Sequence, residues 1–66
     1  MLSLKAYYGK VVRIIATNGL TCIGVVDDYI YPEDNGYGSE SIVLKDSHFD
    51  LYEFTKDNIQ EITILA

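Results

Sequence analysis

The sequence has 66 residues and few of those that metal, disulfide or redox chemistry requires. Cys22 is its one cysteine and His48 its one histidine, so neither an internal disulfide nor a zinc site with a second Cys or His can form. His48 lies beside Asp46 and Asp50, but carboxylates near a turn are usually only solvated. The sequence also lacks a nucleophile elbow and a glycine-rich phosphate loop. We therefore predict no metal, no cofactor and no catalytic residue, and we expect that the protein is not an enzyme.

Basic residues and long apolar runs are also scarce. Five Lys and Arg against ten Asp and Glu give a net charge of −5, the wrong sign for a surface that attracts polyanions as a whole. No run approaches the roughly 18 apolar residues of a membrane span, and the first residues lack the apolar core and cleavage site of a secretory signal. We expect a cytoplasmic protein with no membrane partner, in which any nucleic-acid binding comes from a local site.

The length indicates a single domain over residues 1–66. A chain this short buries only about 60% of the surface that its unfolded form exposes. Small domains usually compensate with disulfides, a metal or a partner subunit. Since Cys22 cannot supply the first two, we expect a homo-oligomer.

Two β-branched runs dominate the first half of the chain. Residues 10–16 and 21–26 favour strands, because β-branched side chains are stiff about χ1 and pack well on a pleated surface. Asn18-Gly19 between them is the pair that best tolerates the positive φ angles of a type I′ turn. Gly24 interrupts the second run, where a glycine marks a bend or a close approach of two backbones. The pattern predicts a tight hairpin whose second strand covers residues 21–31 and bends at Gly24.

The remaining chain reads as three more strands. The expected elements are a loop over residues 32–40, a strand over 41–45, a tight turn at 46–47, a strand over 48–54, a 3₁₀ turn over 55–58 and a strand over 59–65, with Ile59, Ile62 and Ile64 as core candidates. Residues 1–8 are expected to form a helical turn capped by Ser3, or an arm, over one open end of the fold. The fold class is therefore all-β, a small five-stranded SH3-like barrel.

Several positions give the chain a resemblance to the Sm-like (LSm) domain, one of the SH3-like barrels. The residues that resemble its first motif are Gly9, the apolar run 11–15, Gly19, Gly24, Val26 and Tyr29, and those that resemble the end of its second motif are Asp57, Asn58 and Ile59. The resemblance implies an Sm-like barrel, assembly into a ring or dimer, and RNA binding.

The departures from that family fall at its RNA-binding positions. Thr55-Lys56 replaces the family's Arg-Gly corner, so the arginine that helps to hold an RNA base is absent. The loop over residues 32–40 is an insertion where the family has a short turn with Asp and Asn. The nearest candidates for those two positions are Asp34 and Asn35.

These positions and the tyrosines near the loop define the candidate ligand-binding residues. They are Tyr29, Tyr31, Asp34, Asn35, Tyr37, Thr55 and Lys56. One hypothesis is an Sm-like oligomer that binds RNA at a pore-side site made of Tyr31, Asp34, Asn35, Thr55 and Lys56. The alternative is a protein-interaction module, in which three tyrosines and the acids around them, Asp27, Asp28, Glu33, Asp34 and Glu40, bind a basic partner.

Two plainer interpretations remain open. Half-buried tyrosines under a solvated acidic loop would produce the same pattern without any ligand. A structural subunit of a larger complex would fit it as well. In each case the function is binding or assembly, and no step of chemistry is expected.

Overall fold

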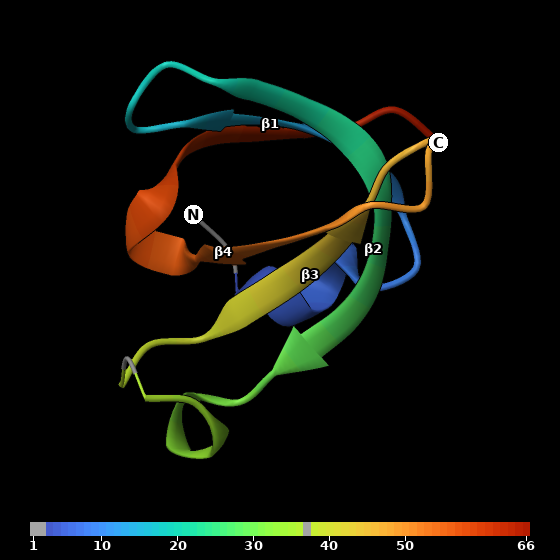
Figure 1. The fold of residues 1–66 in the computed structure, drawn as a ribbon. Helices are drawn as coiled ribbons and strands as arrows, with labels where there is room; N and C mark the ends of the chain where they lie inside the picture. The colour runs from blue at the N-terminus through green and yellow to red at the C-terminus, as the bar shows by residue number, and fades with distance from the viewer. Residues whose placement is uncertain (1–2, 37) are drawn as a thin grey trace.

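The computed structural model describes residues 3–36 and 38–66. The elements in chain order are η1 (Leu4–Tyr7), β1 (Val11–Ala16), β2 (Thr21–Ile30), η2 (Pro32–Asp34), β3 (Ser41–Lys45), β4 (Leu51–Thr55), η3 (Lys56–Asn58) and β5 (Ile59–Ile64), where η denotes a 3₁₀ helix (Figure 1). This part of the chain contains no α-helix. The prediction of a five-stranded all-β fold is confirmed.

β1 and β2 form the predicted hairpin, but its turn is of another type. The strands pair antiparallel, with Ile14 opposite Cys22. Gly19 has a φ of 89°, its N–H donates to the Ala16 carbonyl at 2.9 Å, and no positive φ occurs at Asn18. This is a type I turn followed by a glycine in the left-handed region, the usual three-residue hairpin loop. The prediction of a type I′ turn was wrong because the loop is one residue longer than assumed.

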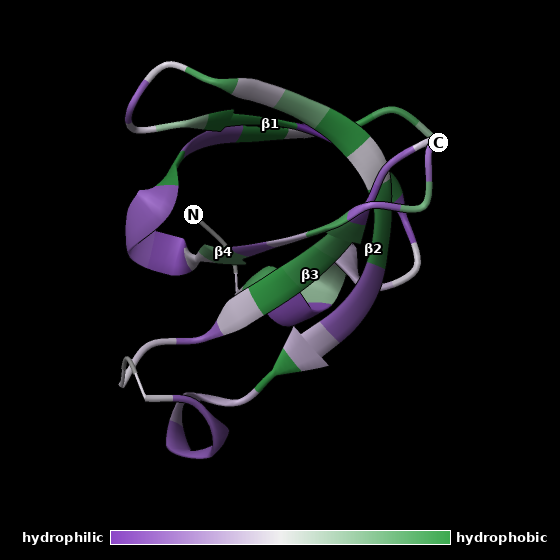
Figure 2. Ribbon diagram, in the orientation of Figure 1, coloured by the Kyte–Doolittle hydropathy of each residue, from purple (hydrophilic) through white to green (hydrophobic). Residues whose placement is uncertain are grey.

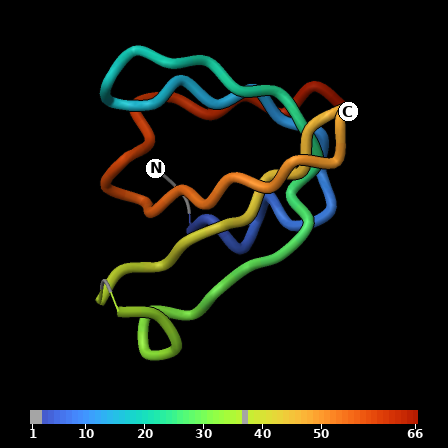
Figure 3. Tube along the Cα trace, in the orientation of Figure 1, coloured from blue at the N-terminus to red at the C-terminus, as the bar shows by residue number. Residues whose placement is uncertain are grey.

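The five strands form one antiparallel sheet in the order β4-β3-β2-β1-β5. β2 arches from the group that contains β1 and β5 to the group that contains β3 and β4, as the trace shows (Figure 3). β4 and β5 lie at the two ends of the order and do not pair with each other within the described residues. The sheet is therefore strongly bent but not closed.

Gly24 lies where β2 passes very close to another backbone. A β-carbon built on Gly24 would meet the carbonyl oxygen of Lys45 and would lie 2.9 Å from its carbonyl carbon. Of the two roles that the sequence allowed for this glycine, a bend or a close approach, the structure shows the close approach. The sheet is also irregular between Val26 and Asp28, where the register of β2 against β3 shifts by one residue. Such a bulge increases local bending and twist, so the curvature of β2 has a second source beyond Gly24.

The apolar residues meet inside the bend of the sheet. The buried cluster consists of Leu4, Val12, Ile14, Val26, Ile42, Leu44 and Ile59. Figure 2 shows the middle of β3 in the hydrophobic colour and the η2 and η3 turns in the hydrophilic one. Ile62 packs against this cluster as predicted, but Ile64 is 50% exposed. Its assignment to the core was wrong because β5 is an edge strand, with no described strand on its far side.

The connection between β3 and β4 is longer than the sequence suggested. The Asp46 carboxylate accepts hydrogen bonds from the backbone N–H groups of His48 at 2.9 Å and Asp50 at 3.0 Å. Phe49 between them has a φ of 64°. The predicted tight turn at 46–47 and the predicted strand start at His48 were therefore wrong, because the Asp46 side chain organises a turn that lasts until Asp50.

Two of the three 3₁₀ turns, η1 and η3, lie where the sequence predicted a helical turn. The Ser3 hydroxyl caps η1 by accepting a hydrogen bond from the Lys5 N–H at 3.3 Å, and Leu4 in η1 is fully buried. η1 contacts β2 and β3, and η3 connects β4 to β5. Among the described residues, no helix has the length and apolar character needed to cross a membrane.

Candidate functional site

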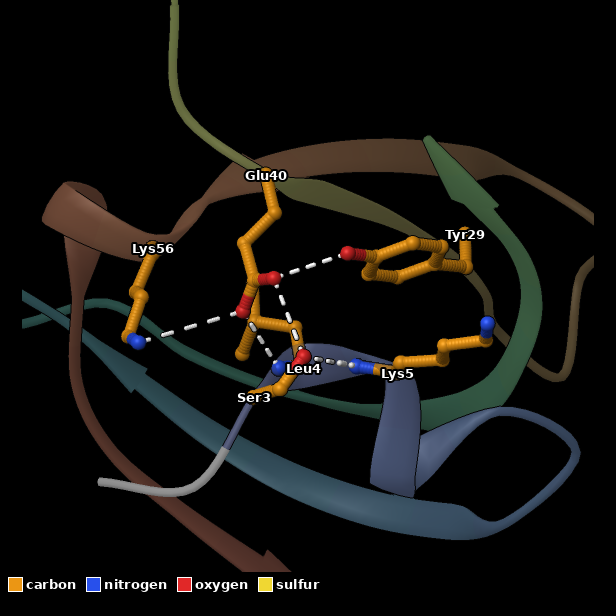
Figure 4. Close-up of polar contacts among 6 residues, drawn as sticks. All are labelled: Ser3, Leu4, Lys5, Tyr29, Glu40 and Lys56. Carbon is orange, nitrogen blue, oxygen red and sulfur yellow. Dashed lines mark hydrogen bonds and ion pairs between the residues drawn. The ribbon is translucent and has the colours of Figure 1, made fainter. Parts of the chain in front are cut away.

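Glu40, just before β3, is the centre of a polar cluster that joins distant parts of the chain (Figure 4). Its carboxylate accepts hydrogen bonds from the Leu4 N–H at 2.6 Å, the Tyr29 hydroxyl at 2.7 Å and the Ser3 hydroxyl at 3.0 Å. The Lys56 ammonium lies 3.9 Å from the same carboxylate. The side chain of Glu40 is only 14% exposed. One carboxylate therefore holds η1, β2 and η3 together, and we call this group of five residues the Glu40 cluster.

The cluster favours the ionised form of Glu40. Burial alone acts to raise the pKa of its carboxyl group, but the hydrogen bonds from Leu4, Tyr29 and Ser3, with the charge of Lys56, outweigh burial. The pKa of Glu40 therefore lies below its ordinary value of 4.5. The hydrogen bond between Tyr29 and Glu40 has the opposite effect on Tyr29. This hydrogen bond is the main cause that raises the pKa of Tyr29, and burial is the second.

Acid is expected to destabilise the fold through Glu40. Because its folded-state pKa is lowered, Glu40 contributes its full stabilisation above pH 4.5 and loses it as the pH falls through the folded-state pKa. Thermal unfolding followed by circular dichroism from pH 7 down to about pH 3 should show this as a falling midpoint below pH 4.5. Asp46, whose pKa is also lowered because its backbone hydrogen bonds to Asp50 and His48 outweigh burial, adds to the loss at lower pH.

The control for this titration is Glu40→Gln. The amide cannot ionise, so the variant should be less stable at pH 7 and should show a shallower decrease of the midpoint on acidification. Parallel pH curves for the two proteins would contradict a specific role of the Glu40 carboxylate.

Two of the predicted ligand residues, Tyr29 and Tyr31, lie against each other on β2 and just after it. Their ring centroids are 5.1 Å apart and their planes meet at 86°, an edge-to-face contact. The Lys5 ammonium donates a hydrogen bond to the Tyr31 hydroxyl at 3.0 Å and lies 5.2 Å from the centroid of the Tyr31 ring. That hydrogen bond raises the pKa of Lys5. The sequence did not single out Lys5, which no local pattern relates to Tyr31.

Of the other predicted ligand residues, Lys56 shares the Glu40 cluster with Tyr29, and the Asn35 amide lies 3.5 Å from the Tyr31 carbonyl, to which it donates. Thr55 is buried and its hydroxyl donates to the Asn58 side chain at 2.6 Å, while Lys56 pairs with Glu40. The Asn35 amide donates to the Ser39 carbonyl at 2.6 Å, across the loop. Asp34 is exposed on η2. Tyr37 lies outside the described residues.

The acids near the tyrosines do not form one open patch. Glu40 is held within its cluster, and Asp27 forms an ion pair with Lys45 at 3.4 Å. Asp28 accepts a hydrogen bond from the backbone N–H of Tyr29 at 2.8 Å. Asp27 and Asp28 on β2 and Glu33 and Asp34 on η2 are all exposed, so only Glu40 of the five acids is drawn into the fold. The acidic surface is thus smaller than the sequence indicated.

Sequence reasoning missed an apolar groove between the β1–β2 hairpin and β4. Its volume is about 710 Å³. Its apolar wall includes Leu20, Ile23, Leu51 and Phe54, of which the first three are more than half exposed. The sequence signal for this groove was the presence of apolar residues on both faces of β4. A strand with one face in solvent alternates apolar and polar residues instead. The groove opens beside β4, one of the two free ends of the sheet.

Cys22 also lines this groove and is half-buried. Burial, with a smaller effect of the Asp46 carboxylate, raises the pKa of its thiol above the ordinary value. A raised pKa keeps the thiol protonated at neutral pH, and the thiolate is the reactive species.

The described residues contain no group of three or more His, Cys, Asp or Glu side chains that could hold a metal ion. His48 and Asp50, which the sequence placed in a strand over residues 48–54, both lie in the turn before β4.

No protein-family model, curated protein or solved structure matches this chain significantly. Two features bear on its function: the Glu40 cluster, and the outer edges of β4 and β5, which pair with no other strand in the described part of the chain.

Proposed function

We propose that this protein is a non-enzymatic assembly module of the Sm-like type, which forms homo-oligomers through the two open edges of its sheet. The observation that carries the proposal is that β4 and β5 end the strand order without pairing to each other in the described part of the chain. An unpaired edge strand presents backbone N–H and C=O groups that another strand can bind. A second copy of the chain supplies such a strand.

Apolar side chains at both edges support the proposal. On β4, Leu51 is 61% exposed and Tyr52 42%, and at the end of β5, Ile64 is 50% exposed and Leu65 48%. Monomeric proteins usually protect such edges with charges, prolines or bulges. Burying these four residues between subunits would also supply the apolar contact that a 66-residue domain lacks.

The difference between the two edges indicates how copies would associate. If β4 of one copy pairs with β5 of the next, the contact is heterologous, and repeated heterologous contacts generate a ring when the rotation closes. The strand order, the strong bend of β2 and the 3₁₀ turn between β4 and β5 support the Sm-like part of the proposal. The cytoplasmic location stays a prediction.

RNA binding at the pore-side site is a weaker part of the proposal. A ring would bring copies of Lys56 close together, but each Lys56 ammonium already lies 3.9 Å from a Glu40 carboxylate. The alternative of a basic protein partner has less support, because Glu40 is held within its cluster and Asp27 forms an ion pair with Lys45. Homo-oligomer assembly is therefore the function that we favour.

Lysine at the two edges is expected to abolish assembly without unfolding the chain. Leu51→Lys and Ile64→Lys each place a charge on a side chain that is at least half exposed, so folding of the monomer should change little. A charge buried at a subunit contact without a partner is strongly unfavourable. Native mass spectrometry of the wild type should show an oligomer, and each variant should shift the distribution to the monomer.

Tyr8→Lys serves as the control, because Tyr8 is a large residue, 59% exposed, outside β4 and β5. It should leave the oligomer intact. A wild-type spectrum that contains only the monomer at micromolar concentration would reject the assembly proposal, and loss of assembly in Tyr8→Lys would show that the two edges are not the contact.

A further inference from the structure

An open pocket of about 390 Å³ lies between η1 and β2, away from both edges of the sheet. Its walls are Lys5, Tyr8, Asp28, Tyr29 and Tyr31. Tyr8 and Tyr31 expose 59% and 44% of their surface. Small-molecule sites in proteins commonly have volumes of about 300 to 1,000 Å³. The pocket is therefore large enough for one small ligand or one unit of a larger one.

The groups that line the pocket are held in place by the rest of the fold. The hydroxyl of Tyr29 is fixed by Glu40 at 2.7 Å, and the Tyr31 ring rests edge-to-face on Tyr29. The Lys5 ammonium is fixed in turn by the Tyr31 hydroxyl at 3.0 Å. A ligand would therefore meet groups that are already ordered, which reduces the entropy lost on binding.

Each of these groups selects a chemical feature of the ligand. The exposed ring of Tyr8, and the part of the Tyr31 ring that Lys5 does not cover, offer flat surfaces on which an aromatic ring can stack. The Lys5 ammonium offers further N–H donors and a positive charge to an anion, and it repels a cationic ligand. The Asp28 carboxylate, which uses one oxygen for the backbone N–H of Tyr29, accepts N–H donors with its other oxygen.

We infer that this pocket binds a nucleotide, with the base on Tyr8 and Tyr31, the phosphate at Lys5 and an amino or ring N–H group of the base at Asp28. A nucleotide is the ligand class that combines an aromatic ring, an anion and hydrogen-bond donors on one molecule. The nucleotide can be free or part of a single-stranded RNA. All five residues belong to one chain, so the site does not depend on the assembly proposed above.

The pocket differs from the pore-side site predicted from the sequence. It shares Tyr31 with that site but uses Lys5 in place of Lys56, whose charge is partly offset by Glu40. With a single lysine, binding releases counterions from about one phosphate, so the affinity should fall only weakly with salt. A strong salt dependence would instead indicate a track of several phosphates.

The test is a titration of ¹⁵N-labelled protein with AMP, adenosine and an oligoadenylate at low salt, observed by NMR. AMP should shift the amide signals of Lys5, Tyr8, Tyr29 and Tyr31 in a saturable way. Lys5→Gln should weaken AMP about tenfold because one charge-assisted contact is lost, and should leave adenosine binding unchanged. Tyr31→Ala should weaken both ligands about tenfold through lost stacking, whereas Tyr31→Phe should retain adenosine binding.

Lys10→Gln is the matched control, an exposed lysine outside the pocket whose replacement should change neither ligand. Binding of both AMP and the oligonucleotide supports a site for the nucleotide in either form, and binding of the oligonucleotide alone supports a strand of RNA. The inference is overturned if neither AMP nor the oligonucleotide, at millimolar concentration, causes a saturable shift at the pocket. So does equal weakening of AMP by Lys5→Gln and Lys10→Gln in variants whose spectra show an intact fold.

Discussion

Gly24→Ala is expected to lower the free energy of unfolding by about 3 kcal/mol, the upper end of the usual range for overpacking. The added β-carbon would overlap the carbonyl oxygen of Lys45 and would lie 3.2 Å from the Asp46 α-carbon. These are backbone atoms, so no side-chain rotation can make room. The strands β2 and β3 would have to separate where Val25 pairs with Lys45.

Urea unfolding followed by circular dichroism measures this effect. Gly36→Ala is the matched control, because a β-carbon at Gly36 meets nothing within 4 Å and Gly36 has no left-handed φ. The control should stay within about 0.5 kcal/mol of the wild type. If Gly24→Ala is as stable as Gly36→Ala, the close approach of β2 to Lys45 is not a feature of the protein in solution.

Glu40→Ala is expected to lower the free energy of unfolding by a similar amount, about 3 kcal/mol, because hydrogen bonds to a charged group contribute more than neutral ones. The change removes the acceptor of the Leu4 N–H, the Tyr29 hydroxyl and the Ser3 hydroxyl together. The backbone of Leu4 is anchored through this carboxylate while its side chain fills the core. Loss of the anchor should release η1 from the sheet.

Two readouts separate this effect from a general loss of stability. Amide hydrogen exchange in η1 should accelerate more than exchange in β1, because η1 loses its anchor while the β1 pairings remain. Glu33→Ala, which removes an exposed acid from the neighbouring η2, should change stability by no more than about 0.5 kcal/mol. Equal effects of Glu40→Ala and Glu33→Ala would show that the Glu40 cluster does not hold the N-terminal turn.

Lys56→Ala tests how much of the stabilisation by Glu40 comes from its ion pair with Lys56. Its ion pair with Glu40 is long, at 3.9 Å, and the Lys56 side chain is 39% exposed. Ion pairs in contact with water contribute little, usually under about 1 kcal/mol. The neutral donors of the cluster, rather than Lys56, should therefore account for most of the effect of Glu40.

The strands and most turns could be predicted from the sequence because their causes are local. β-Branched runs specify β1 and β2, Ser3 supplies the cap of η1, and the polar residues 56–58 supply η3. The errors in the turns were also local in origin, whereas the exposure of Ile64 depends on the position of β5 at the edge of the sheet. The left-handed φ of Phe49 depends on the Asp46 carboxylate, and a period of two along residues 48–54 gives no sign of it.

The candidate sites were harder to predict because their groups come from separate segments. Glu40 was read as one acid of a solvated loop, since its partners Ser3 and Leu4 lie 37 and 36 residues away. Lys5 and Tyr31 are 26 residues apart and share no pattern. Only the packing of η1 onto β2 and β3 brings these residues within hydrogen-bond distance.

The sequence by itself determined the five strands, the hairpin around Gly19, the need for glycine at position 24 and the absence of a complete zinc or disulfide ligand set, because these depend on residue type and on spacing over a few positions. Tertiary structure decided which acid faces inward, which strands lie at the edges of the sheet, and that Tyr29, Tyr31 and Lys5 share a pocket. The physical reason is that burial and pairing depend on contacts between distant segments, whose free energies no local pattern contains.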